Sequence, residues 1–220
     1  MPGEPTQRIE LAPKAAGMDS DQGGRAHEAD LIARAGRRDA GAMRELIDAH
    51  KDRLHAFVWR MVRNHHDAEE LCQESFLKAF ASLHTFNFQF RFSTWLFTIA
   101  YRLCLNQLRR KRSLTGEMDF GVIPDGQPGI EEEAAQSEEA ARLKAMIWAA
   151  VDQLSVPQRA AVLLFYKQEQ SCAEIAQVLQ LPVSTVKSHL HRARAHLKDL
   201  LEPAVAGDSS RLRIFSQAAG

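Results

Sequence analysis

Residues 86–112 have the sequence FNFQFRFSTWLFTIAYRLCLNQLRRKR. The predicted helices of the chain lie on either side of this stretch. Phenylalanine occupies every second position from 86 to 92, a helix-like run with Trp95 and Tyr101 follows, and the stretch ends in a basic cluster. No acidic residue occurs between Glu74 and Glu117. Because bases stack on aromatic rings and phosphates bind lysine and arginine, this pattern favours contact with single-stranded nucleic acid. A core helix with a solvated basic end is the alternative interpretation.

Helices are predicted on the N-terminal side of this stretch. No glycine or proline occurs between Gly41 and Gly116, and the segment is rich in alanine, leucine, arginine and glutamate. Such a composition is typical of helices. We expect them at about residues 28–35, from 39 to about 64, and from Asp67, which would cap the third helix with acidic residues in its first turn. The sequence therefore predicts an all-α fold.

Residues 171–200 are predicted to form a helix-turn-helix. Ser171 and Glu174 have the spacing of a capping box, residues 180–183 form the turn, and Ser184 would cap the second helix. The outward faces of that helix are polar and basic, with no acid until position 199: Thr185, Lys187, Ser188, His191, Arg192, Arg194 and Lys198. In this motif the second helix lies in the DNA major groove. A helical hairpin with a solvated basic face is the alternative.

The charge pattern divides the chain into two small helical domains. Residues 116–137 contain four glycines and two prolines, and every charged residue from Glu117 to Glu139 is acidic. This composition predicts a flexible acidic linker. We expect a disordered N-terminal tail at 1–26, helical domains at 27–112 and 138–201, a linker at 113–137 and a C-terminal tail at 202–220.

Several classes of protein are disfavoured by composition. The formal net charge is zero, which argues against a general nucleic-acid coat protein. No run is apolar enough to span a bilayer and no signal core is present, so we expect a cytoplasmic protein without membrane insertion. Cys72, Cys104 and Cys172 are scattered and are expected to be small buried hydrophobes. We find no metal-ligand spacing, phosphate loop or catalytic set, and expect no metal, no cofactor and no enzymatic activity.

Three stretches carry a resemblance to a known family. They are DAEELCQESFLKA at 67–79, FSTWLFTIA at 92–100, and the pieces EIA, PVSTVKS and RAR at 174–176, 182–188 and 192–194. In this order they resemble the bacterial RNA polymerase sigma factors of the extracytoplasmic-function (ECF) group of the sigma-70 family, over residues 27–201. The resemblance implies a subunit that binds the beta-prime clamp and beta flap of core RNA polymerase, directs it to promoter DNA, and is restrained by an anti-sigma factor.

The resemblance also implies three sets of contact residues. Polymerase binding would use Asp67, Glu70, Gln73 and Glu74. Recognition and melting of the minus-ten element would use Phe86, Asn87, Phe88, Arg91, Thr94, Arg102, Asn106, Arg109, Arg110 and Arg112. Reading of the minus-thirty-five element would use Ser184, Thr185, Lys187, Ser188, His191 and Arg192. The loop at 84–91 would capture a base flipped from the non-template strand. Which of the alternating phenylalanines point into the core stays open, and Trp95 is expected in the core.

Three residues depart from the family pattern. Gln180 stands where the family usually has a turn glycine, His189 replaces a common arginine, and Cys72 replaces an aliphatic residue. Two alternative functions are disfavoured by the sequence. A stand-alone helix-turn-helix regulator would not explain residues 67–79 or 86–112. An adaptor that mimics a sigma factor would carry a receiver-like block of alternating strands and helices, which this sequence lacks.

Overall fold

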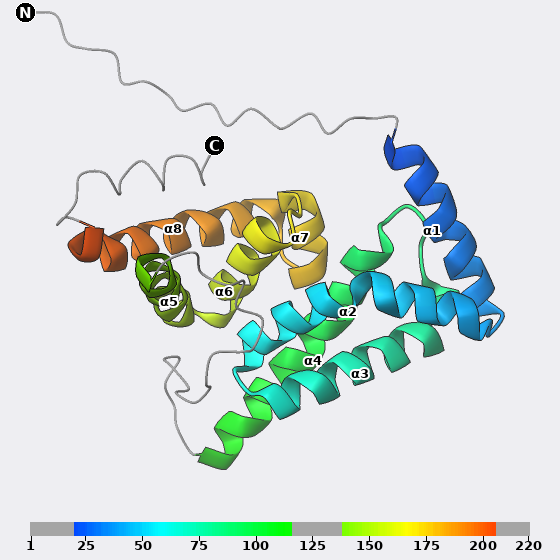
Figure 1. Ribbon diagram of the computed structural model, residues 1–220, viewed down its shortest axis with the longest axis horizontal. Coiled ribbons are helices and arrows are strands. Elements are labelled where there is room, and N and C mark those ends of the chain that lie inside the picture. Colours follow the sequence, from blue (N-terminus) through cyan, green and yellow to red (C-terminus); the bar gives the residue numbers. More distant parts are fainter. Residues whose placement is uncertain (1–19, 116–137, 206–220) are drawn as a thin grey trace, which may run out of the picture.

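The computed structural model describes residues 20–115 and 138–205, and within these ranges the regular elements are all helical. They form two groups, which we call the N-terminal unit (α1–α4) and the C-terminal unit (α5–α8) (Figure 1). The predicted all-α fold is confirmed. The main elements are α1 (Ser20–Gly36), α2 (Ala40–Val62), α3 (His65–Ala81), α4 (Phe92–Thr115), α5 (Glu138–Asp152), α6 (Val156–Val162), α7 (Cys172–Leu179) and α8 (Val183–Val205).

The junction between α2 and α3 differs from the prediction. Helix α2 ends where Arg63 adopts a left-handed backbone with φ of 57°. Asn64 then caps α3 by accepting a hydrogen bond from the backbone N–H of Asp67 at 2.9 Å. The prediction that α3 begins at Asp67 is therefore wrong, because an asparagine amide caps a helix as well as a carboxylate does and comes three residues earlier.

Two other helix starts lie earlier than predicted. Helix α1 begins at Ser20 rather than near Glu28, because its first turns lack the apolar periodicity on which the prediction relied. Helix α8 begins at Val183, so Ser184 lies in its first turn and is not its cap. The predicted tails and linker fall mostly on residues 1–19, 116–137 and 206–220, which lie outside the described residues.

Large apolar side chains hold the N-terminal unit together. Helix α2 packs against α1, α3 and α4. Phe57 of α2 is buried and meets the ring of Phe97 of α4 edge-on, with 5.2 Å between ring centroids. Leu54 and Leu46 of the same helix are also fully buried. Each such side chain contributes about 1.5–3 kcal/mol by leaving water, so this packing fixes α4 on α2.

Local caps fix the short helices of the C-terminal unit. The predicted capping box of α7 is confirmed: the Ser171 N–H donates to Glu174 Oε2 at 2.8 Å, and the Glu174 N–H donates to Ser171 Oγ at 3.3 Å. Gln180 ends α7 in a left-handed conformation with φ of 56°. A π-helical turn, Leu163–Lys167, follows α6 and was not predicted.

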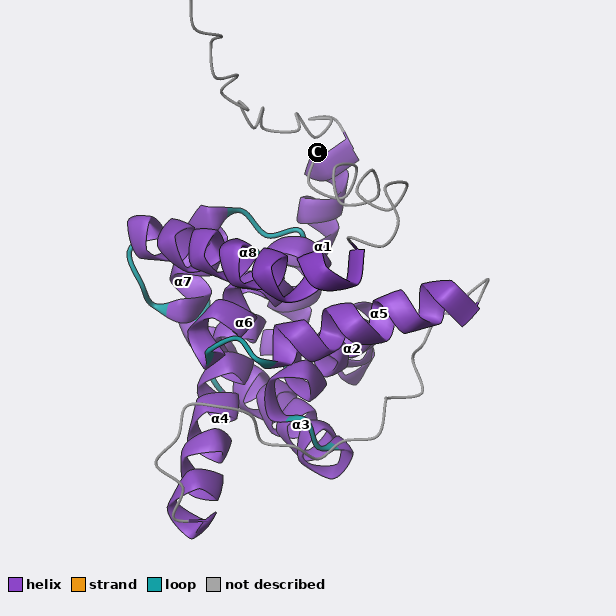
Figure 2. Ribbon diagram, turned by 90° about the vertical axis from the view of Figure 1, so that its left-hand side faces the viewer, coloured by secondary structure: helices purple, strands orange, loops and turns teal. Residues whose placement is uncertain are grey.

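The two units touch one another. Helix α7 packs against α4, and α6 packs against α2, so the first helix of the helix-turn-helix lies beside the N-terminal unit (Figures 1 and 2). Within residues 20–115 and 138–205, no helix combines the length and the apolar character needed to cross a bilayer.

Candidate nucleic-acid interface

The alternating phenylalanines divide between core and surface. Phe86 and Phe92 are buried, whereas Phe88 and Phe90 are 61% and 44% exposed. The Phe86 ring anchors the segment, because its centroid lies 5.1 Å from that of Phe88 and 5.3 Å from that of Trp95. The structure thus shows which of the alternating phenylalanines point into the core. Phe90 is exposed beside Phe88, although it was not among the predicted contact residues.

A turn centred on Asn87 presents these rings. The Asn87 side-chain oxygen accepts a hydrogen bond from the Gln89 N–H at 2.9 Å, and its carbonyl accepts one from the Phe90 N–H at 3.0 Å. Because the side-chain oxygen of Asn87 is hydrogen-bonded within the turn, it fixes the backbone of the loop. We call residues 86–91 the aromatic loop.

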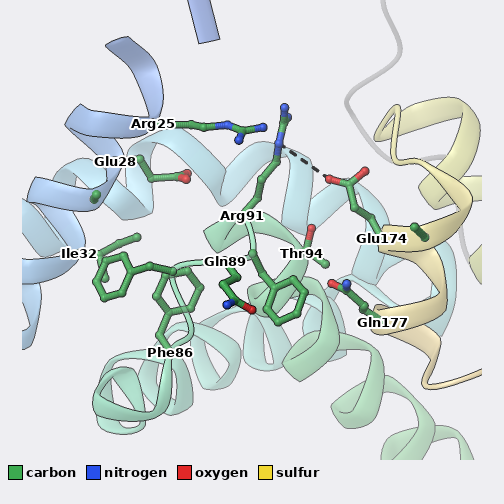
Figure 3. A pocket seen from close by; sticks show the side chains of 13 residues that line it. Arg25, Glu28, Ile32, Phe86, Gln89, Arg91, Thr94, Glu174 and Gln177 are labelled. Carbon is green, nitrogen blue, oxygen red and sulfur yellow. Dashed lines mark ion pairs between the residues drawn. The ribbon is translucent and has the colours of Figure 1, made fainter. Parts of the chain in front are cut away.

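A cavity of about 300 Å³ lies behind the aromatic loop (Figure 3). Its walls come from α1, the aromatic loop, the start of α4 and helix α7. Thr94 lines it and is only 2% exposed, and its hydroxyl has no hydrogen-bond partner within the described part of the chain. Thr94 therefore lies at the inner wall of the cavity, with its hydroxyl buried. Arg91 of the loop lies 3.8 Å from a carboxylate oxygen of Glu174 on α7.

Glu28 of α1 also lines this cavity and supports the start of α4. Its pKa is lowered, first by a hydrogen bond to His50 and further by the backbone N–H of Phe92 and the charge of Arg91, while partial burial opposes the shift. The carboxylate thus stays ionised near the first turn of α4, where the helix dipole favours an anion.

Helix α4 carries its cations along an exposed face. Arg102, Asn106, Arg109 and Arg110 are exposed. Asn106 follows Arg102 by four residues, and Arg109 and Arg110 follow Asn106 by three and four, so all four lie on one side of the helix. Arg112 is partly buried. The structure brings these predicted residues together on one helix, within a segment that contains no acid.

Helix α3 presents a mixed acidic and apolar stripe. Glu70, Gln73 and Glu74 are exposed, and Leu77, one turn further, is 70% exposed. Asp67 differs from the other predicted polymerase contacts. Its side chain is 13% exposed and forms an ion pair with Lys111 of α4 at 2.5 Å, so it faces the N-terminal unit. Leu77 was not among the predicted contacts, although its spacing from Glu70, Gln73 and Glu74 places it on the same face of the helix.

Helix α8 exposes its N-terminal half. Ser184, Lys187, Ser188, His191 and Arg192 are exposed, and Thr185 is partly exposed. The opposite face is buried through Val186, Leu190 and Ala193, as predicted. All six residues predicted to read the minus-thirty-five element therefore lie on the outward sides of one helix.

Burial shifts the pKa values of one histidine and two cysteines. Burial, helped by the charge of Arg192, lowers the pKa of His189, which favours its neutral form. Burial raises the pKa of Cys72 to about 12 and also raises that of Cys104, so both thiols resist ionisation. Among the described residues, no three histidine, cysteine or acidic side chains gather as a metal site would require.

Comparison with known proteins identifies the family. The model of sigma-70 region 2 matches residues 46–114, and that of sigma-70 region 4 matches residues 144–197. The ECF RNA polymerase sigma factor SigW of Bacillus subtilis is 32% identical over 174 residues, which are 74% of this chain and 90% of that protein. The ECF sigma factor SigE of Mycolicibacterium smegmatis is 35% identical, over 71% of this chain and 60% of that protein. This chain belongs to the ECF sigma factors of the sigma-70 family.

Solved structures agree with this assignment. The sigma factor RpoE from Bartonella quintana, solved with the anti-sigma factor NepR, matches with a TM-score of 0.61 and 25% identity, over 72% of this chain and 96% of that chain. CnrH, solved with the cytosolic domain of CnrY, shares the fold, with a TM-score of 0.59, 23% identity, and coverage of 80% and 97%.

As an ECF sigma factor, the chain acts in promoter-specific transcription initiation. The region 2 match falls on α2, α3 and α4, and the region 4 match falls on α5 to α8. The aromatic loop and the basic face of α4 thus belong to region 2, and the helix-turn-helix belongs to region 4.

Proposed function

We propose a division of labour between the two units of this sigma factor. Within the N-terminal unit, the domain at residues 27–112 binds core polymerase and opens the minus-ten element. Within the C-terminal unit, the domain at residues 138–201 reads the minus-thirty-five element. The observation that carries the proposal is that exposed aromatic rings adjoin a basic helix on one unit, while an exposed basic recognition helix lies on the other.

The stripe on α3 is the proposed contact with the beta-prime clamp. Glu70, Gln73 and Glu74 supply the polar part and Leu77 an apolar centre, a combination that suits a protein interface with a polar rim. Asp67 positions this surface through its ion pair with Lys111. Direct contact by Asp67 would require this partly buried ion pair to break. Contact of the C-terminal unit with the beta flap completes the attachment to polymerase.

The aromatic loop is the proposed site for the parted strand. Phe88 and Phe90 offer exposed rings for base stacking, and Phe86 supports them from the core. Base–aromatic stacking is worth about 1–3 kcal/mol per base, comparable to the few kcal/mol that extruding a base requires. A flipped base would enter the cavity, where Thr94 supplies a buried hydroxyl.

The basic face of α4 would then follow the strand backbone. Arg102, Asn106, Arg109 and Arg110 lie on the exposed side of the helix, and Arg91 precedes it. Arg112, which is partly buried at the far end, would contribute less directly. Phosphate contacts of this kind position the strand without reading its sequence.

Helix α8 is the proposed reader of duplex DNA. Ser184, Thr185, Lys187 and Ser188 lie in its first turns, which in a helix-turn-helix reach the base edges. His191 and Arg192 lie one turn further, where backbone phosphates are expected. Burial, and then the charge of Arg192, lowers the pKa of His189, which favours its neutral form and makes it a weaker phosphate partner than the arginine common at this position.

The proposed function requires no catalysis by the sigma factor itself and no cofactor. The protein would act in the cytoplasm, where polymerase meets DNA. An anti-sigma factor is proposed as a further partner. The support is that the similar structures RpoE and CnrH were solved with NepR and CnrY respectively.

Reconstitution with core polymerase tests this function. We expect run-off transcripts from a subset of genomic fragments, and permanganate reactivity at the melted strand only when both the chain and polymerase are present. A stand-alone regulator would bind duplex DNA without polymerase. A mimic would bind a protein partner but no DNA. Either of these results, without polymerase-dependent melting, would refute the proposal.

A further inference from the structure

The π-helical turn after α6 contacts an exposed arginine of α8. The Nε of Arg194 donates a hydrogen bond to the hydroxyl oxygen of Tyr166 at 2.7 Å. The guanidinium carbon of Arg194 lies 5.6 Å from the ring centroid of Phe165 and 5.7 Å from that of Tyr166. Both distances fall within the range of cation–π attraction. One hydrogen bond and two aromatic rings therefore hold the Arg194 side chain, although it is exposed to solvent.

The π-helical turn, Leu163–Lys167, brings these two rings to α8. Its closing hydrogen bond runs from the Gln168 N–H to the Leu163 carbonyl at 3.2 Å. Such turns appear mostly as single turns next to α-helices and are frequent at functional sites. Within the turn Leu163 is buried, Phe165 is half-buried and Tyr166 is 40% exposed. The ring of Tyr166 therefore lies at the surface, beside the exposed part of α8.

The apolar core already packs α8 against α6 without this contact. The inward face of α8 is buried through Val186, Leu190 and Ala193, and α6 packs directly against the helix. A hydrogen bond between two exposed side chains adds little to such packing, because water competes for both groups. Its main effect is to restrict the rotamers of Arg194. An arginine that is already held loses less conformational entropy when it binds a ligand.

Arg194 extends the row of residues predicted to read duplex DNA. It follows Lys187 by seven residues and His191 by three, so the three side chains share one face of α8. Arg194 lies about 10 Å beyond Lys187 along the helix axis. The major groove is about 12 Å wide, so a helix whose first turns reach base edges has its later turns near the phosphates at the rim of the groove. No acidic residue between Glu174 and Asp199 would repel a phosphate there.

The chemistry of the held arginine suits a phosphate. The hydrogen bond to Tyr166 uses Nε, so the two terminal nitrogens of the guanidinium can face a further acceptor. Parallel N–H groups of arginine match the oxygens of a phosphate, and charged hydrogen bonds of this kind are stronger than neutral ones. A base edge is a less suitable partner, because Arg194 lies beyond the first turns of α8.

We propose that Arg194 binds a backbone phosphate of duplex DNA and that Tyr166 is a positioning residue, which holds the guanidinium for that contact. The proposal deepens the proposed function and rests on its assignment of α8 as the duplex reader. Neither residue is among the six predicted to read the minus-thirty-five element. A phosphate contact fixes the orientation of α8 in the groove without selecting a sequence. The π-helical turn thereby takes part in DNA binding through Tyr166.

The test is a double-mutant cycle of Tyr166→Phe and Arg194→Ala in the full-length chain. Phenylalanine keeps the aromatic ring and removes the hydroxyl that accepts the bond from Arg194. Fluorescence anisotropy of a labelled DNA duplex of mixed sequence gives the affinity of the free chain between about 50 mM and about 200 mM salt. A mixed sequence suffices, because phosphate contacts do not depend on base identity. Circular dichroism confirms that each variant keeps its helices. The control is Arg44→Ala, which removes one exposed cation from α2.

Arg194→Ala should weaken duplex binding about tenfold at the lowest salt and lower the slope of log affinity against log salt by about one, as the loss of one phosphate contact requires. Tyr166→Phe should weaken binding about threefold, because Arg194 keeps its charge but loses its hydrogen bond. In the Arg194→Ala background, Tyr166→Phe should have no further effect, since Tyr166 acts through Arg194. The control should stay within about twofold of the wild-type affinity, because a distant exposed charge is screened.

Three results would overturn the proposal. An unchanged salt slope for Arg194→Ala, or no duplex binding by the wild-type chain, would remove the phosphate contact. Unchanged affinity for Tyr166→Phe would remove its positioning role. An equal loss from Tyr166→Phe in both backgrounds would mean that Tyr166 acts on the fold of the C-terminal unit and not through Arg194. The cycle requires neither polymerase nor promoter. Its failure therefore leaves the transcription test of the proposed function unaffected, and a failed transcription test leaves the result of the cycle standing.

Discussion

The two surfaces proposed to bind DNA differ in accessibility. Helix α8 of the C-terminal unit exposes its N-terminal half to solvent, whereas α7 packs over α4 and forms a wall of the cavity at the aromatic loop. In this conformation the proposed duplex-binding face of α8 is accessible, whereas the proposed strand-binding surface at the aromatic loop is partly covered by α7. The difference shows that the accessibility of the aromatic loop depends on where the C-terminal unit lies as well as on the fold of the N-terminal unit.

The two units also differ in what stabilises them. The N-terminal unit relies on long helices and large buried rings such as Phe57 and Phe97. The C-terminal unit contains shorter helices whose ends are fixed by Ser171, Glu174 and the left-handed Gln180. Core substitutions should therefore act most strongly in the first unit, and cap substitutions should be detectable in the second.

The largest expected effect is on the stability of the N-terminal unit. Phe57→Ala should lower its free energy of unfolding by about 3–5 kcal/mol, because it leaves a cavity beside Phe97. Chemical denaturation followed by circular dichroism measures the change. Leu77→Ala, at a position 70% exposed, is the control and should change stability by less than about 0.5 kcal/mol. Equal effects at the two positions would contradict the assigned core.

The next largest expected effect is on promoter recognition by α8. Lys187→Ala with Arg192→Ala should cost about 1–3 kcal/mol in binding the minus-thirty-five element, while binding of core polymerase is kept. Competitive transcription from promoters with and without that element measures the loss. Lys198→Ala, further along the same helix, should select promoters as the wild type does. Normal promoter selection by the double variant would mean that α8 is not the reader.

A smaller effect is expected at α3. Glu74→Arg should weaken binding to core polymerase about tenfold, because it reverses a charge at the centre of the exposed stripe. Its ion pair with Lys78, at 3.3 Å, is exposed and contributes little to stability, so the fold should be kept. Fluorescence anisotropy of the labelled chain gives the affinity. Glu45→Arg makes the same charge change on α2 and should have no effect. Unchanged affinity for Glu74→Arg would remove α3 from the polymerase interface.

Much of the fold followed from patterns that act locally. The absence of glycine and proline before position 116 predicted helices, and the spacing of Ser171 and Glu174 predicted a capping box that the structure contains. The start of α3 was misplaced because Asn64 and Asp67 are both good caps, and only the backbone geometry at Arg63 decides between them. Local signals could not decide this, since the choice depends on where α2 ends.

The candidate site was harder to predict, because exposure depends on contacts between distant segments. Alternation alone left the phenylalanines unassigned, and packing against Phe92 and Trp95 distinguishes buried Phe86 from exposed Phe88. The inward turn of Asp67 requires Lys111, which lies forty-four residues away in the sequence. The contact of Arg53 with Gln168 joins residues 115 positions apart, and no sequence pattern marked either one.

The smallest expected effect concerns the turn of the helix-turn-helix. Gln180 has φ of 56°, and the turn closes through the Leu181 N–H, which donates to the Ala176 carbonyl at 3.0 Å. Gln180→Gly should stabilise the C-terminal unit by about 0.5–1 kcal/mol, because a left-handed backbone strains a side chain by more than the added glycine entropy costs. Gln177→Gly, the same substitution inside α7, should instead destabilise the unit by a similar amount, since glycine weakens a helix interior. Urea denaturation of the C-terminal unit gives the free energy of unfolding and distinguishes the two substitutions. Destabilisation by both would show that the left-handed backbone at Gln180 carries too little strain to offset the entropy that glycine adds.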